Sequence, residues 1–398
     1  MPFLIAHPRD LAARGVEPGG LDAVFVTGDA YVDHPSFGAA LLGRLLEAEG
    51  FKVGILARPD PDDVEAFRLL GRPRLAFLVA AGALDSMVSS YTANNKPRSE
   101  DDYAPGGRPE LCLRADGTVG PGKAGRRNAR PDRTTIAYAA KCREAYKGVP
   151  VVVGGVEASL RRLAHYDYWS DKVRRSILLD SKADLLVHGM GERALLEIMR
   201  RLKAAADSGG DLAGAAAAIR GLRGTAWRAG KRPELEAGSF EEVPPYARAQ
   251  ADKAAYAEHF RAQYRNSEAA SARALLEETD GRFVVAEPPA FPLAGPELDR
   301  IYELPYERAA HPMYEALGGV PALEEVKFSL VSSRGCFGAC SFCAIALHQG
   351  RLVTARSRES LLREAKVLTG LPGFKGYIHD VGGPTANFRG PACAKMAR

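Results

Sequence analysis

The sequence predicts an α/β protein that opens with a Rossmann-like, doubly wound parallel sheet. Short β-rich runs alternate along the chain with segments of helical periodicity, which is the pattern of strand–helix–strand units. One run, 75–80, is apolar without alternation, as expected for a strand covered by helices on both faces. The length of 398 residues exceeds one hydrophobic core and suggests two or three domains of roughly 150 residues each.

The expected elements follow one another in a regular order. The first half reads as strand 23–27, helix 36–49, strand 51–56, helix 62–70 and strand 75–80. A long interval rich in Gly and Pro separates these from helix 136–146, strand 150–155, a helical stretch, strand 183–188 and helix 192–203. We therefore expect the strands to share one sheet.

The second half is less regular. The Ala- and Gly-rich stretch 204–224 reads as a linker, and 247–278 carries helical charge spacing. A strand is expected at 325–332, then a cysteine loop, a helix at 358–369 and a strand at 376–381. Ser357 should cap that helix and Gly370 should end it. These elements predict an N-terminal domain over 1–300, with a helical extension, and a second domain that starts within 320–398.

Composition and charge restrict the class of protein. With 46% hydrophobic and 26% charged residues, disorder and coiled coil are poor interpretations. The longest apolar run, 75–84, has about half the length of a bilayer span, and the N-terminus has no secretory pattern, so we expect a cytoplasmic protein without a membrane partner. The net charge of +5 comes mostly from 106–133, which holds seven basic and three acidic residues. A basic loop rich in Gly and Pro is usually solvated, so a nucleic-acid partner is only weakly supported.

Three of the six cysteines lie within eight residues, in a CxxxCxxC loop formed by Cys336, Cys340 and Cys343. The loop follows a predicted parallel strand, where cofactors dock in α/β folds. Three thiolates suit an iron–sulfur cluster that keeps one iron open to an exchangeable ligand. Three other interpretations stay open: a Cys3His zinc site that includes His348, a redox pair of Cys340 and Cys343, and buried unligated thiols.

The cysteine loop also has an aromatic residue, Phe342, immediately before its last cysteine. With this feature it resembles the signature of the radical S-adenosylmethionine (radical SAM) superfamily. The wider sequence resembles the YgiQ-like branch in four segments: VTGDAYVDHPSFG at 26–38, VVVGGVEASLRR at 151–162, SSRGCFGACSFCAI at 332–345 and DVGGPTAN at 380–387.

The resemblance implies a four-iron four-sulfur cluster on Cys336, Cys340 and Cys343, with Phe342 near the adenine of S-adenosylmethionine. Gly382 and Gly383 would meet the methionyl amino group, whereas Pro384 replaces a glutamate found in many members. The cluster, reduced by a flavodoxin- or ferredoxin-type donor, would cleave the nucleotide to a 5′-deoxyadenosyl radical that takes hydrogen from an unknown substrate. The implied fold is the first βα units of a partial TIM barrel, and such a barrel needs about six units, so we expect a longer protein.

Several residues remain open from sequence alone. Asp29, Asp33 and His34 follow the first predicted strand and either bind a ligand or serve in caps and turns. Gly154, Gly155 and Glu157 either line a pocket or close it, and 165–175 reads as a half-buried amphipathic helix rather than a base-stacking surface. We expect no cobalamin cofactor because the DxHxxG motif is absent. Cys393 either joins a further cysteine group or is a lone thiol. The rival to an enzyme is a non-catalytic module that binds zinc or an inert cluster.

Overall fold

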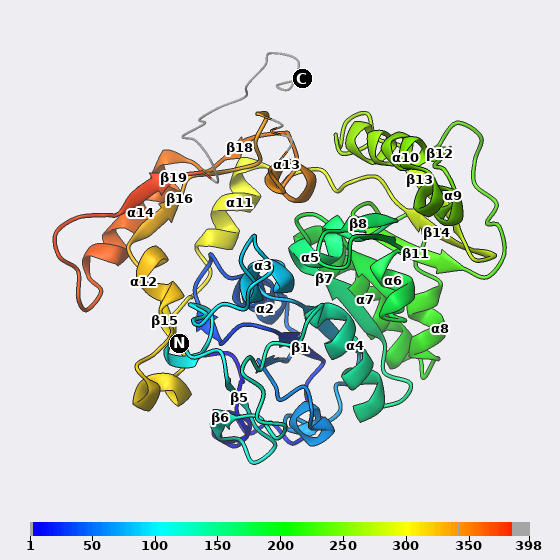
Figure 1. The fold of residues 1–398 in the computed structure, drawn as a ribbon. Helices are drawn as coiled ribbons and strands as arrows, with labels where there is room; N and C mark the ends of the chain where they lie inside the picture. The colour runs from blue at the N-terminus through cyan, green and yellow to red at the C-terminus, as the bar shows by residue number, and fades with distance from the viewer. Residues whose placement is uncertain (1–2, 339, 341, 384–398) are drawn as a thin grey trace.

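A nine-stranded sheet forms the centre of the protein in the computed structural model, which describes residues 3–338, 340 and 342–383 (Figure 1). Its parallel part consists of β3 (Val53–Ala57), β1 (Ala23–Thr27), β4 (Ala76–Ala80), β7 (Val151–Gly154) and β10 (Leu185–Val187). The sheet continues with β11 (Thr225–Ala229), β14 (Arg282–Ala286), β13 (Ala274–Thr279) and β12 (Phe240–Glu242). Of these, β11, β14 and β13 join by antiparallel pairing, and β12 runs parallel to β13.

The order of the parallel strands is β3-β1-β4-β7-β10, which is second, first, third, fourth and fifth along the chain. This is the flavodoxin-like order of doubly wound sheets, whereas the Rossmann order places the third strand outside the second. The α/β class and the large parallel sheet are therefore as predicted, and the Rossmann-like detail is not confirmed. Periodicity identifies strands and helices, but it does not tell on which side of β1 the next strand is added.

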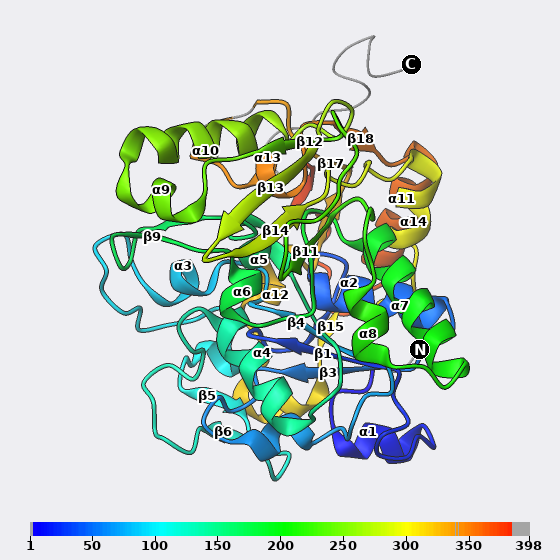
Figure 2. The same cartoon turned by 90° about the vertical axis from the view of Figure 1, so that its right-hand side faces the viewer.

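Helices cover both faces of the sheet (Figure 2). Along β1, Ala23 and Phe25 belong to one core and Val24 and Val26 to the other, because successive strand side chains point to opposite faces. One face carries α2 (Gly38–Ala48), α7 (Glu192–Asp207) and α8 (Leu212–Ala217). The other carries α4 (Thr134–Ala145), α6 (Ile177–Asp180) and a 3-10 helix, η1 (Val64–Arg68). The helix expected at 62–70 is thus the tighter 3-10 form.

The middle of the chain differs most from the expectation. The linker expected at 204–224 contains the end of α7 and all of α8. The helical region expected at 247–278 forms α9 (Tyr246–Ala251) and α10 (Lys253–Arg265) and then becomes β13. The stretch 165–175 forms a hairpin, β8 (His165–Asp167) and β9 (Lys172–Arg174), rather than a helix. The error at 247–278 arises because buried acids such as Glu277 on β13 have the charge spacing of a helix.

Short elements complete the region around the sheet. The helices are α1 (Pro8–Ala13), α3 (Ser86–Ser90), η2 (Pro105–Gly107), α5 (Gly155–Leu160), α11 (Gly295–Tyr302) and η3 (Pro312–Leu317). The strands are β2 (Val32–Asp33), which pairs with β15 (Ala309–Ala310), and β5 (Leu111–Leu113), which pairs with β6 (Val119–Pro121).

The elements after residue 320 stand beside this sheet and share no strand with it (Figure 1). They are α12 (Ala322–Val326), β16 (Ser329–Val331), β17 (Ser333–Arg334), α13 (Ile345–His348), β18 (Thr354–Ala355), α14 (Arg358–Thr369) and β19 (Asp380–Gly382). The Ser357 side chain accepts a hydrogen bond from the Ser360 N–H at 3.1 Å, and Gly370 ends α14, both as predicted. Leu361 and Leu368 of α14 pack against Leu330 of β16. The strand expected at 325–332 is shorter because its first residues belong to α12.

A search of the helices in the described part of the chain finds none that is long and apolar enough to cross a membrane.

Candidate functional site

The cysteine loop and the glycine turn lie at the same edge of a small parallel sheet. β16 and β19 pair in parallel, with Val331 opposite Gly382. Parallel strands place their carboxyl ends on one side, so the loop that follows β16 and the turn that follows β19 leave the sheet together. The two strands are about fifty residues apart in the sequence, and the resemblance implied that they belong to βα units of one barrel.

The start of the cysteine loop is fixed by backbone contacts with residues 349–355. Gly335 has φ of +84°, and a side-chain carbon there would lie 2.2 Å from the Leu352 carbonyl oxygen, so only glycine fits. The Gly335 N–H donates to the Gln349 side chain at 3.1 Å, and the Cys336 N–H donates to the Gly350 carbonyl at 3.0 Å. These contacts position Cys336 at the base of the loop.

The three sulfurs differ in their surroundings: Cys336 is buried, Cys343 is half-buried and Cys340 is exposed. A side-chain carbon at Gly338 would lie 3.4 Å from Cys336 Sγ and 3.9 Å from Cys340 Sγ, so both sulfurs lie close to that glycine. Three cysteine thiolates would suit a four-iron cluster in which three of the irons each bind one of them.

Among the residues that the structure describes, no three His, Cys, Asp or Glu side chains gather so that they could hold one metal ion. The zinc interpretation also needed His348, but its Nδ1 lies 3.0 Å from Ser159 Oγ. That three cysteines share one cluster stays a prediction from sequence.

The other implied cofactor contacts have different positions. Gly382 and Gly383 line a cavity of about 520 Å³ together with Ser333 and Arg334, which directly precede the cysteine loop. Phe342 is 90% exposed and does not line this cavity, and neither do the three cysteines. Pro384 and Cys393 lie outside the described residues.

Sequence reasoning missed Arg334, which ties the cysteine loop to the central sheet. Its guanidinium forms a buried ion pair with Glu192, the first residue of α7, and its Nε donates to the Tyr302 hydroxyl at 3.1 Å. Burial favours the neutral form, but the Tyr302 and Glu192 partners outweigh it and raise the pKa of Arg334. The sequence shows that Arg334 directly precedes the cysteine loop, but this position alone does not indicate that Glu192 is its partner.

Burial lowers the pKa of His348 to about 4; the Glu192 charge opposes this effect, and the Arg334 charge adds to it by a smaller amount. This imidazole is therefore neutral at pH 7. It also lines the cavity, so it adds no charge to the wall.

Asp33 and His34 have structural partners rather than an open ligand position. Asp33 is buried against Arg44 of α2, and its carboxylate also accepts from the Glu307 N–H at 3.1 Å. His34 Nε2 lies 3.2 Å from the Arg308 guanidinium, which continues to Glu364 of α14. Burial lowers the pKa of His34 well below its usual range, with a smaller effect of the Arg308 charge. The motif at 26–38 thus connects the central sheet to the helix beside the cysteine loop.

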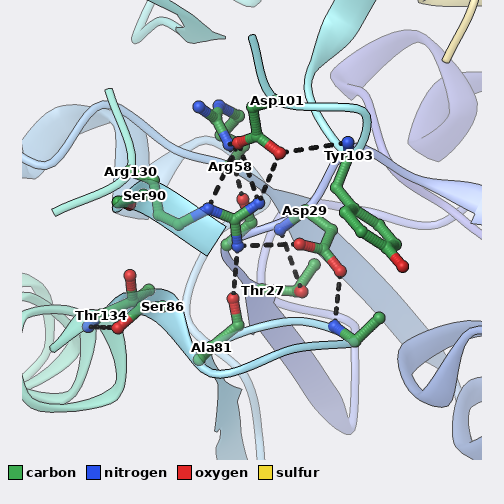
Figure 3. A network of polar contacts seen from close by, with 12 residues as sticks. Thr27, Asp29, Arg58, Ala81, Ser86, Ser90, Asp101, Tyr103, Arg130 and Thr134 are labelled. Carbon is green, nitrogen blue, oxygen red and sulfur yellow. Dashed lines mark hydrogen bonds and ion pairs between the residues drawn. The ribbon is translucent and has the colours of Figure 1, made fainter. Parts of the chain in front are cut away.

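Asp29 belongs to a buried network that holds the basic insertion on the sheet (Figure 3). Its carboxylate lies 2.8 Å from the Arg130 guanidinium and accepts from the Ala83 N–H at 2.6 Å. Asp101 joins Arg130 at 3.1 Å and Arg58 at 2.8 Å. Burial raises the pKa of Asp29, and Arg130 opposes that effect. Part of the positive charge counted at 106–133 is therefore buried and paired, not displayed.

Glu157 likewise closes the end of the sheet instead of lining the cavity. It is 1% exposed and accepts from the backbone N–H groups of Ser86 at 2.9 Å and Thr135 at 3.0 Å. Gly154 and Gly155 do line the cavity.

Comparison with protein families decides the identity, because the family model described as "Radical SAM N-terminal" matches residues 3–329. The chain belongs to this radical SAM family. Among curated proteins, a UPF0313 protein of Clostridium botulinum (strain 657 / Type Ba4) is 47% identical over 395 residues, which is 99% of this chain and 57% of that protein. A UPF0313 protein of Clostridium perfringens (strain 13 / Type A) is 49% identical over 397 residues, again 99% of this chain and 55% of its own length. The resemblance to the YgiQ-like family, which comprises such proteins, is confirmed.

The radical SAM chain spans a little over half the length of these curated relatives. Among solved structures, it is similar to the radical S-adenosylmethionine methyltransferase TsrM from Kitasatospora setae, with tryptophan substrate and a SAM analogue bound. That likeness has a TM-score of 0.43 and 15% sequence identity, and covers 87% of this chain and 45% of the other.

Proposed function

We propose that this radical SAM chain is part of an enzyme that binds a four-iron four-sulfur cluster through Cys336, Cys340 and Cys343 and S-adenosylmethionine beside it. The observation that carries the proposal is the parallel register of β16 and β19, which puts the cysteine loop and the Gly382–Gly383 turn at one edge. Membership of the radical SAM family supports the same cofactors.

The residues of this chain have separable tasks in the proposal. Cys336, Cys340 and Cys343 supply thiolates, and Gly335 lets the backbone turn tightly enough to present them. By the resemblance, the backbone at Gly382 and Gly383 would hold the methionyl amino group of S-adenosylmethionine, and Phe342 would lie near the adenine. When bound, the cluster and nucleotide supply a carbon-centred radical that takes hydrogen from a substrate.

Electrons must reach the cluster from a reductant. Cys340, one of the proposed cluster ligands, is exposed to solvent. An exposed loop is accessible to a small donor protein, so a flavodoxin- or ferredoxin-type partner is the proposed electron source.

Anaerobic reconstitution of the chain with iron and sulfide tests the cluster. We expect a brown protein with about four irons per chain and an EPR signal that changes when S-adenosylmethionine is added. Serine at Cys336, Cys340 or Cys343 should abolish both properties.

Serine at Cys112 or Cys142 is the matched control, and the iron content should not change. Both thiols are buried, and burial raises the pKa of Cys112 to about 12, so neither is a thiolate at neutral pH. A colourless protein that holds one zinc would refute the proposal.

A further inference from the structure

The cavity beside the glycine turn extends to the central sheet. Its volume of about 520 Å³ lies within the range of small-molecule sites. One wall is made by β16, β19 and the residues before the cysteine loop, and the opposite wall by the carboxyl ends of β1, β4, β7 and β10. The cavity therefore joins two parts of the fold that share no strand.

The sheet wall lies where a doubly wound sheet normally binds ligands. From β1 the chain goes to β3 on one side and then to β4 on the other, so the strand order reverses between β1 and β4. Phe25 in the middle of β1 and Ala80 at the end of β4 both line the cavity. Ligands of open α/β sheets bind in the crevice outside the strand ends at this reversal.

The sheet wall is apolar. Its side chains include Phe25, Leu42, Leu78, Val152, Val187 and Leu195. Charged groups among the described lining residues lie elsewhere: Glu192 and Arg334 neutralise each other, and Glu325 and Asp380 are exposed to solvent. The wall offers no unpaired charge that could pair with a charged ligand. Because burying an unpaired charge is costly, a charged ligand would bind this wall poorly.

We infer that the substrate of the proposed reaction is an uncharged, mainly apolar small molecule whose body rests on the sheet wall of this cavity. The inference rests on the proposed function, because the opposite wall contains Gly382 and Gly383, assigned above to the nucleotide. The central sheet thus contributes the surface on which the substrate binds. Phosphorylated compounds and nucleic acids are excluded as occupants of this wall.

Gly38 offers a way to fill the cavity without disturbing the fold. It lines the cavity at the start of α2, and an added side-chain carbon would have no heavy atom within 4 Å. Gly38→Leu therefore places an apolar group into the space, and Ser36→Leu, at a second lining position, serves as an independent variant. The matched control is Gly230→Leu, because Gly230 has equally open surroundings and does not line the cavity.

The test uses two fluorescent compounds with the same aromatic skeleton: neutral N-phenyl-1-naphthylamine and its 8-sulfonate, titrated into the cluster-free chain. We expect saturable binding of the neutral compound at about one per chain, and at least roughly tenfold weaker binding of the sulfonate. Gly38→Leu and Ser36→Leu should each weaken binding of the neutral compound by about tenfold or more, and Gly230→Leu should not.

The inference is overturned if the neutral compound does not bind, if the sulfonate binds as tightly, or if Gly38→Leu and Ser36→Leu both bind like the Gly230→Leu control. The titration needs neither iron nor nucleotide, so its result is independent of cluster assembly. A chain that binds the neutral compound as expected but assembles no cluster would refute the proposed function and leave the apolar site. A chain that assembles the cluster without discriminating between the compounds would refute the apolar site alone.

Discussion

Replacing Glu192 by alanine should destabilise the connection between the cysteine loop and the central sheet. Glu192 and Arg334 are 4% and 8% exposed at their side chains, so the pair is almost fully removed from water. In Glu192→Ala the Arg334 guanidinium stays buried without its counter-charge. It keeps the Tyr302 hydroxyl at 3.1 Å and the Tyr302 ring at 5.1 Å.

Removing one partner of a buried ion pair costs about 3–5 kcal/mol of unfolding free energy. Because Tyr302 continues to contact the guanidinium, we expect the lower end, about 3 kcal/mol. Glu192→Gln keeps the size and one hydrogen-bond acceptor, so its loss should be smaller, about 1–2 kcal/mol.

Urea unfolding followed by circular dichroism measures this loss, and iron content after reconstitution reports on the loop. The control is Arg193→Ala, one residue along α7, because the Arg193–Glu297 pair is 44% and 47% exposed. An exposed pair contributes less than about 1 kcal/mol. Equal losses for Glu192→Ala and Arg193→Ala would refute the reasoning that burial makes the first pair matter.

Three further changes have expected outcomes. Asp101→Ala leaves two buried guanidinium groups short of a partner and should cost about 3–5 kcal/mol in urea unfolding, whereas Asp62→Ala, whose arginine partner is 49% exposed, should cost under about 1 kcal/mol. Burial lowers the pKa of His348 to about 4, so the free energy of unfolding that it contributes is complete above about pH 6.5 and falls as the pH drops toward 4. Between pH 7 and pH 5 the original chain should therefore lose about 2 kcal/mol more of its free energy of unfolding than His348→Gln does, as measured by urea unfolding at the two pH values. Gly335→Ala forces a side chain into left-handed backbone 2.2 Å from the Leu352 carbonyl oxygen, so reconstituted iron should fall to the level of the cysteine variants; full iron loading would contradict this.

Local signals in the sequence identified the elements that frame the site. The strand 23–27 and the Ser357 cap were predicted correctly because each depends on a few neighbouring residues. The parallel pairing of β16 and β19 agrees with the βα units that the resemblance implied, whereas their register was not predicted. Those are the features on which the proposed cofactor site depends.

Long-range partners were not predictable in the same way. Glu192 and Arg334 are 142 residues apart, and either could pair with many opposite charges along the chain. The strand β13 was taken for helix because its buried Glu277 pairs with His259, which no local pattern indicates. The assignment of Asp29, Asp33 and His34 likewise required knowing that Arg130, Arg44 and Arg308 reach them.

The pairing of β15 with β2 has a consequence for dissecting this protein. The backbone N–H groups of Arg308 and Glu307 donate hydrogen bonds to Asp33, so the segment that contains β15 covers the motif at 26–38. Expressing the sheet region without residues 303–314 would leave Asp33 and His34 facing water where they now meet protein. Truncated variants made to study the sheet by itself should therefore retain residues 303–314. Without them, the measured stability would include the cost of exposing Asp33 and His34 to water.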